Sequence, residues 1–318
     1  MNITVIGCGR WGSLIAWYLD RIGHRVTLYG RAGSSHMERF LESRSNDLLT
    51  LPPSVALSTD LEEAIGSDVI LIAVGAQSLR TLAQQLAGQG IHNKKVVLCM
   101  KGLEKETGLR LTQIVESFLP DDNQTAVWLG PGHVQEFYAG IPNCMVIDSR
   151  DRDVKKELVE AFSSDLIRFY YGQDLIGNEI GAASKNVIGI AAGMLDGMGY
   201  VTLKGPLISR GTREISRLIA AAGGSELSAY GLCHLGDYEA TVFSPYSHNR
   251  QYGEAFVRGV PYDSLAEGRD TSAALMILSS HLGVELPICR TVYSVLFEGL
   301  DPRLGMEMLL RRPLKNEF

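Results

Sequence analysis

The first half of the chain alternates short apolar runs with longer segments in which apolar residues recur at helical spacing. The runs are rich in branched side chains and cover residues 2–6, 25–29, 55–57, 69–74, 96–100, 126–129, 144–147 and 167–171. Strands that alternate with helices form an open, mainly parallel sheet with helices on both faces. The pattern therefore predicts a doubly wound α/β domain, whose ligands bind beyond the carboxyl ends of the strands.

The second half has a different pattern. After about residue 172 the strand signals fade, and Ala, Leu, Met and Ile recur at helical spacing in residues 213–222, 272–282 and 292–297. This periodicity is typical of amphipathic helices. We expect an α/β domain over residues 1–173 and an all-helical domain over residues 174–318, packed directly with the functional site between them.

A glycine-rich turn follows the first predicted strand and opens a helix over residues 11–22. Gly7 permits a tight turn, Gly9 lets a pyrophosphate approach the backbone, and Gly12 lets helix and strand pack closely. Arg10 and Trp11 lie within the same turn. Because a helix N-terminus favours anions, this unit predicts a Rossmann-type dinucleotide site. The alternative is a structural turn without a ligand.

The tip of the second predicted strand bears on the choice between NAD and NADP. An acidic residue there bonds the ribose 2′-hydroxyl and repels a 2′-phosphate, whereas this chain has Tyr29, Gly30 and Arg31. NADP(H) should therefore be accepted. Arg31 fits a contact to the 2′-phosphate and fits a solvated loop cation equally well.

Two further turns follow predicted strands at the expected ligand edge of the sheet. Lys101 comes after the strand that ends near residue 100, and it could hold a phosphate or polarise a hydroxyl. Gly130 and Gly132 follow the strand at residues 126–129, where small residues let the backbone approach a bound molecule. Each of these alone also fits an ordinary loop.

Residues 181–194 contain many small side chains and a single ionisable one, Lys185. Such a run would make a poor exposed helix, so we expect a buried one. Desolvation would lower the pKa of Lys185 and suit the amine to proton transfer. The alternative is a lysine whose stem packs while its ammonium reaches water.

A carboxylate and a basic cluster follow later in the chain. Asp237 and the run Ser247, His248, Asn249 and Arg250 flank a segment that Pro245 and aromatic residues should order. They could hold Lys185 and a phosphorylated substrate together. His248 is also compatible with a capping role.

Composition narrows the class of protein. The chain has 318 residues, 45% hydrophobic and 21% charged, with a formal net charge of −6, so it lacks the basic excess that binds nucleic acid or anionic lipid non-specifically. No apolar stretch reaches spanning length, and we expect a cytoplasmic protein without stable membrane insertion. Five scattered cysteines without paired spacing indicate free thiols and no metal site.

Taken in order, these motifs resemble the NAD(P)-dependent glycerol-3-phosphate dehydrogenases, bacterial-type enzymes that are not membrane-embedded. The resemblance spans nearly the whole chain and includes further matches at Glu136, Val187, Asp196-Gly197, Arg210-Gly211, Gly236, Glu267-Gly268, Leu286-Pro287-Ile288 and Val292-Tyr293. It implies an oxidoreductase that interconverts dihydroxyacetone phosphate and sn-glycerol 3-phosphate with NAD(P)H, supplying phospholipid synthesis and thus lipid metabolism. It also suggests a homodimer.

The resemblance assigns roles to the candidate residues. Lys185 would be the catalytic acid and base, with Asp237 orienting it. Substrate contacts would come from Lys101, Gly130, Gly132, Ser247, His248, Asn249 and Arg250. Cofactor contacts would come from Gly7, Gly9, Arg10, Trp11, Gly12, Arg31, Lys101, Val134 and Glu267.

Two positions depart from the family pattern. Gly132 stands where a Ser or Thr is usual, and His248 stands where an Arg is expected to grip the substrate phosphate. An imidazole cannot reproduce the bidentate fork of a guanidinium, which typically costs about ten- to a hundred-fold in affinity. Arg250, Lys101 or helix N–H groups could compensate. Two other readings therefore stay open: a dehydrogenase with a shifted hydroxy or keto substrate, and a nucleotide-sensing module without activity.

Overall fold

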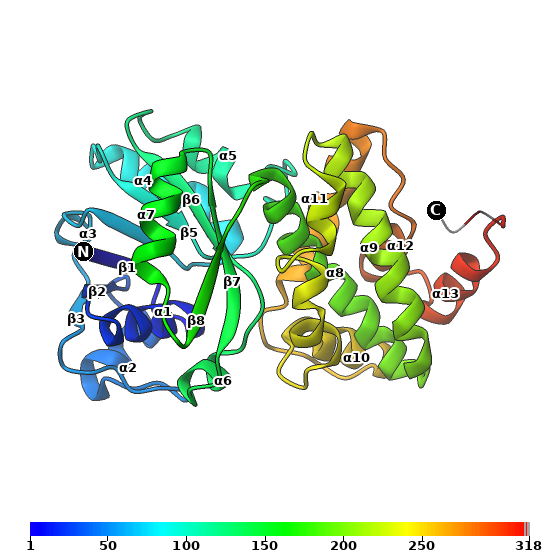
Figure 1. The fold of residues 1–318 in the computed structure, drawn as a ribbon. Coiled ribbons are helices and arrows are strands. Elements are labelled where there is room, and N and C mark those ends of the chain that lie inside the picture. The colour runs from blue at the N-terminus through cyan, green and yellow to red at the C-terminus, as the bar shows by residue number, and fades with distance from the viewer. Residues whose placement is uncertain (315, 317–318) are drawn as a thin grey trace. The chain divides into compact units, whose positions relative to one another are not determined.

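The computed structural model describes residues 1–314 and 316 and divides into two compact units (Figure 1). The first unit comprises residues 1–101 and 110–179, and the second comprises residues 102–109 and 180–318. The expected division after residue 173 differs from this in two places. Residues 102–109 belong to the helical unit, and the change between units falls within one long helix, because that helix continues through residue 179 without a break.

The helices and strands alternate in the first unit, as the apolar pattern predicts. In the first unit the elements are β1 (Asn2–Ile6), α1 (Arg10–Arg21), β2 (Arg25–Tyr29), α2 (Ser35–Ser43), β3 (Ala56–Ser58), α3 (Leu61–Ala64), β4 (Val69–Ile72), α4 (Leu79–Gly88), β5 (Lys95–Leu98), α5 (Leu111–Glu116), β6 (Gln124–Leu129), α6 (Val134–Tyr138), β7 (Asn143–Ser149), α7 (Arg152–Phe162) and β8 (Ile167–Tyr171). Then come α8 (Leu175–Met198), α9 (Lys204–Ala221), α10 (His248–Arg258), α11 (Glu267–Leu282), α12 (Pro287–Phe297) and α13 (Pro302–Leu310).

The strands form one sheet in the order β3-β2-β1-β4-β5-β6-β7-β8. All neighbours are parallel except β6 and β7, which confirms the expectation of a mainly parallel sheet. Ile6 at the end of β1 lies in register with Tyr29 of β2 and Ile72 of β4. Strand order therefore reverses at β1, and the glycine-rich turn follows this switch point, where doubly wound sheets bind ligands.

Two strands end earlier than their apolar runs. The predicted strands at residues 69–74 and 96–100 end at Ile72 and Leu98, although Cys99 and Met100 are buried and residues 73–74 are half-buried. Periodicity alone cannot separate a strand from the buried loop that follows it.

The second unit is helical, and α8 is its buried central element. Residues 177–195 of this helix are all buried, as their small side chains predict. A Cβ added at Gly193 would lie 1.9 Å from the Arg250 carbonyl oxygen, and one at Gly253 would lie 2.1 Å from the Ile190 carbonyl oxygen. Helices α8 and α10 thus pack backbone to backbone. Over residues 1–314 and 316, no helix is both long and apolar enough to cross a bilayer.

Candidate active site

The glycine-rich turn of the first unit depends on two glycines. Gly7 has φ +113°, and a Cβ there would lie 2.4 Å from the Ala73 carbonyl oxygen. A Cβ at Gly12 would lie 1.9 Å from the Gly7 carbonyl oxygen. A side chain at either position would collide with backbone, so both glycines serve the close packing of turn, helix and strand.

Gly9 differs from the other two, because no heavy atom lies within 4 Å of the Cβ it lacks. It is the N-cap of α1, and no side chain caps that helix end. The first N–H groups of a helix have no intrahelical partner, so open space at Gly9 fits a pyrophosphate. Arg10 beside it is exposed, while Trp11 packs near Phe137, with ring centroids 6.1 Å apart.

The tip of β2 lies against this turn. A Cβ at Gly30 would lie 2.7 Å from the Cys8 sulfur, so the tip approaches the glycine-rich turn closely. Arg31 follows and is exposed. Arg31 is thus a cation that follows β2, and its neighbours in the sequence are not carboxylates. This placement fits both a contact to a 2′-phosphate and a solvated loop cation.

The turns after β5 and β6 meet within the first unit. The Lys101 ammonium donates to the Gly130 carbonyl oxygen at 2.6 Å. Gly132 has φ +140°, and a Cβ there would lie 2.2 Å from Cε2 of Phe137. The glycine in place of a hydroxyl residue therefore has a local packing reason. Val134, which begins α6, is buried.

Lys185 lies in the second unit, on the buried face of α8. Its side chain is 8% exposed, and Nζ lies 2.9 Å from Oδ2 of Asp237. Nζ also donates to the hydroxyl of Thr241 at 2.6 Å. Burial of this amine confirms the expectation from the small-residue run and excludes the alternative in which its head group reaches water. The Asp237 carboxylate stabilises the ammonium form inside the protein.

Thr241 was missed by sequence reasoning. It lies in a single π-helical turn, Glu239–Phe243, that follows Asp237. A hydroxyl four residues after the carboxylate carries no motif by itself, and only the turn geometry brings it to the amine. π-helical turns are frequent at functional sites.

His234 is a second residue beside Lys185 and Asp237 that the sequence did not indicate as part of the site. Its Nδ1 lies 2.8 Å from the Gly181 carbonyl oxygen, and its Nε2 lies 2.8 Å from the Tyr238 hydroxyl. Burial lowers the pKa of His234 to about 4, so the ring is neutral at pH 7. Nδ1–H then donates to the carbonyl and Nε2 accepts from Tyr238.

The His234 imidazole links the segments that carry Lys185 and Asp237. Gly181 lies one helical turn before Lys185, and His234 lies three residues before Asp237. The ring therefore fixes the turn that carries Asp237 to the helix that carries Lys185. With both ring nitrogens in hydrogen bonds, His234 has no nitrogen left to act as a base toward the neighbouring Cys233.

Asn249 and Ser247 shape the start of two helices beside α8. The Asn249 side-chain oxygen accepts from the Gly268 N–H at 2.9 Å, and a Cβ at Gly268 would lie 2.6 Å from the Asn186 carbonyl oxygen. The start of α11, with Glu267, therefore lies against α8. Ser247 caps α10 by accepting from the Arg250 N–H.

Arg250 and His248 have structural partners in this unit. The Arg250 guanidinium contacts Asp196 at 2.8 Å and Glu254 at 3.0 Å, so much of its donor capacity is used inside the helical unit. His248 begins α10, and its Nδ1 lies 2.6 Å from the Tyr262 hydroxyl.

The arrangement supports proton transfer to a ligand oxygen. A buried ammonium held by a carboxylate and a hydroxyl is a positioned proton donor, and the open glycine-rich turn can hold a dinucleotide phosphate. Within the described part of the chain, no group of His, Cys, Asp and Glu side chains could hold a metal ion. All five cysteines are free thiols.

Comparison with known protein families covers nearly the whole chain. Residues 2–155 match the model of the NAD-dependent glycerol-3-phosphate dehydrogenase N-terminus, and residues 174–307 match the model of its C-terminus. A glycerol-3-phosphate dehydrogenase (NAD(P)+) of Prosthecochloris aestuarii is 36% identical over 333 residues, covering 100% of both chains. One of Thermoanaerobacter sp. is 32% identical over 330 residues, covering 100% of this chain and 99% of the relative.

A solved structure agrees with these matches. The glycerol-3-phosphate dehydrogenase of Coxiella burnetii superimposes with a TM-score of 0.91 at 27% identity, covering 98% of this chain and 99% of that one. The glycine-rich turn thus lies in the residues that match the N-terminal family model, and the Lys185 cluster lies in those that match the C-terminal model. The chain belongs to the NAD-dependent glycerol-3-phosphate dehydrogenase family.

Proposed function

We propose that this chain reduces dihydroxyacetone phosphate reversibly to sn-glycerol 3-phosphate with NAD(P)H. The observation that carries this proposal is the buried contact of 2.9 Å between Lys185 Nζ and Asp237. The reduced nicotinamide supplies a hydride to the C2 carbonyl carbon when it is bound. Lys185, as an ammonium, donates a proton to the oxygen of that carbonyl as negative charge develops.

The other residues of the site bind and orient in this proposal. Gly7, Gly9 and Gly12 form the cradle for the pyrophosphate, with Arg10, Trp11, Val134 and Glu267 as further cofactor contacts. Lys101, Gly130, Gly132, Ser247, His248, Asn249 and Arg250 bind substrate. Asp237, Thr241 and His234 keep the Lys185 ammonium in place.

NADP(H) is accepted alongside NAD(H) in this proposal, with Arg31 as the contact to the 2′-phosphate. Exposure of Arg31 and the lack of a carboxylate in the sequence at the tip of β2 support this. A cytoplasmic homodimer that supplies phospholipid synthesis completes the proposal. The five free thiols support a reducing compartment.

His248 favours a second candidate, a dehydrogenase for a different hydroxy or keto compound. Its imidazole is bonded to Tyr262 and stands where the family pattern has a phosphate-gripping arginine. NAD(P)H oxidation should be followed with dihydroxyacetone phosphate and with unphosphorylated ketones, in the native chain and in His248→Arg.

For the primary function, we expect turnover with dihydroxyacetone phosphate to exceed turnover with every unphosphorylated ketone. His248→Arg should lower KM for the phosphorylated substrate about ten- to a hundred-fold, the value of a charged hydrogen bond. Preference for an unphosphorylated ketone would replace the first candidate with the second. Nucleotide binding without turnover of any compound would indicate a nucleotide-sensing module without activity.

A further inference from the structure

The helical unit contains a cavity that the proposed reaction does not use. It has a volume of about 870 Å³ and is lined by residues of α8, α9, α12 and α13 and of the segment after α13. Ligand pockets usually span roughly 300–1,000 Å³. The cavity is therefore large enough for an organic ligand.

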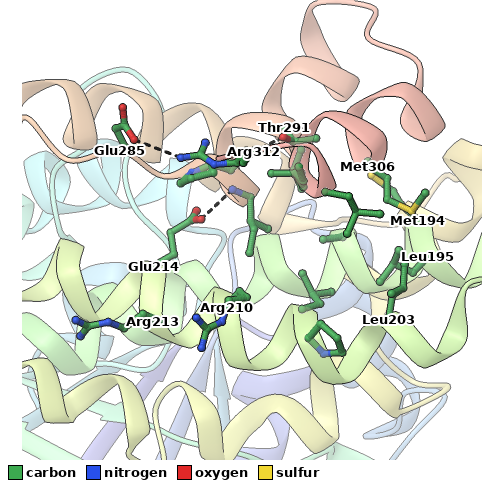
Figure 2. Close-up of a pocket in the computed structure, with 18 of the residues that line it drawn as sticks. Met194, Leu195, Leu203, Arg210, Arg213, Glu214, Glu285, Thr291, Met306 and Arg312 are labelled. Atoms are coloured by element: carbon green, nitrogen blue, oxygen red, sulfur yellow. Dashed lines mark hydrogen bonds and ion pairs between the residues drawn. The ribbon is translucent and has the colours of Figure 1, made fainter. Parts of the chain in front are cut away.

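One end of this cavity is apolar. Figure 2 shows Met194, Leu195, Leu203 and Met306 together at this end. Val292, Val295 and Leu309 also line the cavity. Aliphatic and thioether side chains adapt to a flexible hydrocarbon chain and offer it no polar partner.

The other end carries excess positive charge. Arg210, Arg213, Arg217 and Arg312 line the cavity, against two acids, Glu214 and Glu285. Figure 2 shows Arg213, Arg312 and Glu285 away from the apolar end. Polar and apolar groups are thus separated along the cavity, as an amphiphile requires.

The two lining acids differ in what they contact, and Arg213 is paired outside the cavity with Glu226 at 3.1 Å. Glu214 accepts from the backbone N–H groups of Ile288 and Cys289 at 2.8 and 2.9 Å, and burial raises its pKa to about 7. It therefore caps α12 and is partly neutral at pH 7. Glu285 pairs with Arg312 at 3.4 Å.

Two guanidinium groups converge at this end. Arg217 donates to the Glu285 carbonyl oxygen at 3.3 Å, next to the ion pair of Arg312 with the Glu285 carboxylate. A guanidinium carries five N–H donors, so these contacts leave donors on both side chains for an anion.

From this separation of charge we propose that the cavity binds a long-chain fatty acid, with its carboxylate at Arg217 and Arg312 and its tail among Met194, Leu195 and Met306. A second copy of the chain is a poorer occupant. A twofold interface centred here would place the same patch on both sides and bring the arginine cluster against either its own copy or the apolar end of the partner, with no anion to pair it in either case. This proposal is independent of the activity on dihydroxyacetone phosphate.

The test is calorimetric titration of the full chain with laurate below its micellar concentration. We expect saturable binding of one laurate per chain, with affinity that rises about fourfold per methylene from octanoate to laurate. Dodecyltrimethylammonium, which has the same tail and the opposite charge, should bind at least about tenfold more weakly.

Two variants test the arginine cluster and the apolar lining of the cavity. Arg217→Gln combined with Arg312→Gln should weaken laurate at least about tenfold, while Arg152→Gln on α7 of the other unit should not change it. Leu309→Trp, which adds bulk to the apolar lining of the cavity, should also weaken laurate binding. Circular dichroism verifies that each variant is folded.

Several results would overturn the proposal. Absence of saturable laurate binding, equal binding of the cationic amphiphile, or unchanged affinity in both the arginine and the Leu309 variants would each exclude a fatty-acid site. Sedimentation that shows self-association lost in Leu309→Trp, with no laurate binding to the native chain, would assign the cavity to a second copy. Because the readout is binding, a failure here leaves the proposed reaction untouched.

Discussion

The glycine-rich turn and the Lys185 cluster reach functional geometry by opposite means. The turn works by removing side chains, since a Cβ at Gly7 or Gly12 would collide with backbone while the space at Gly9 stays open. The Lys185 cluster works by crowding polar side chains into an apolar helix bundle, where Lys185, Asp237, Thr241 and His234 are all buried. The first region exposes backbone N–H groups to a ligand, and the second shields an ammonium from water.

This difference decides how each region should respond to mutation. In the turn, a small added side chain should disturb the packing of the turn or hinder the binding of the cofactor. In the cluster, removal of one charge leaves another buried without its partner. The following variants test that contrast, from the largest expected change in stability to the smallest.

Removal of the Asp237 charge should have the largest effect on stability. Asp237→Asn leaves the Lys185 ammonium buried without its carboxylate, which should lower the free energy of unfolding by about 3–5 kcal/mol. Denaturant titration measures this. The matched control is Asp47→Asn, which removes the carboxylate of an exposed ion pair with Arg39. That variant should leave the free energy of unfolding unchanged, and an equal loss in both would contradict a special role for burial.

His234 should make stability depend on pH. Its pKa is about 4 in the folded chain and about 6.5 in the unfolded one. Between these values the unfolded chain binds a proton that the folded chain refuses, so stability is lost as pH falls from about 6.5 to about 4. A difference of 2.5 pKa units corresponds to about 3 kcal/mol.

His234→Gln should remove this pH dependence. We expect the native chain to lose about 3 kcal/mol relative to the variant between pH 7 and pH 4. Urea titrations at both pH values provide the measurement. Parallel losses in the two proteins would mean that the imidazole is not held neutral by burial.

The glycine-rich turn offers a matched pair of variants. Gly12→Ala places a Cβ against the Gly7 carbonyl oxygen and should lower the free energy of unfolding by roughly 1–3 kcal/mol. Gly9→Ala meets open space and should leave stability nearly unchanged while it weakens cofactor binding. Thermal unfolding and fluorescence titration with NADH separate the two effects. The same stability loss in both would contradict the distinct roles.

Much of the first region was predictable from sequence. The alternation of apolar runs predicts the sheet, and three glycines within six residues predict the turn, because the contact between Gly12 and Gly7 is local in the chain. The contact of Gly7 with Ala73 is not local, and only the folded chain shows it. The antiparallel placement of β7 was not predictable in this way, since strand direction depends on where the chain returns to the sheet.

The second region was predictable only in part. The run of small residues in α8 predicts a buried Lys185, and the family resemblance adds Asp237. Thr241 and His234 lie 56 and 49 positions beyond Lys185 and carry no spacing signal, so only the folded chain shows their contacts. The glycine at position 132 likewise reads as a lost hydroxyl in sequence, whereas the structure shows Phe137 in that space.

In the proposed reaction, the Lys185 ammonium donates the proton to the carbonyl oxygen as the carbonyl carbon is reduced. The most direct measurement compares the single-turnover oxidation of NADH by dihydroxyacetone phosphate in the native chain and in Lys185→Ala, with NADH affinity measured on both. We expect the rate to fall by about 10²- to 10⁴-fold, the usual contribution of a general acid, with NADH affinity nearly unchanged. An undiminished rate in Lys185→Ala would exclude Lys185 as the proton donor.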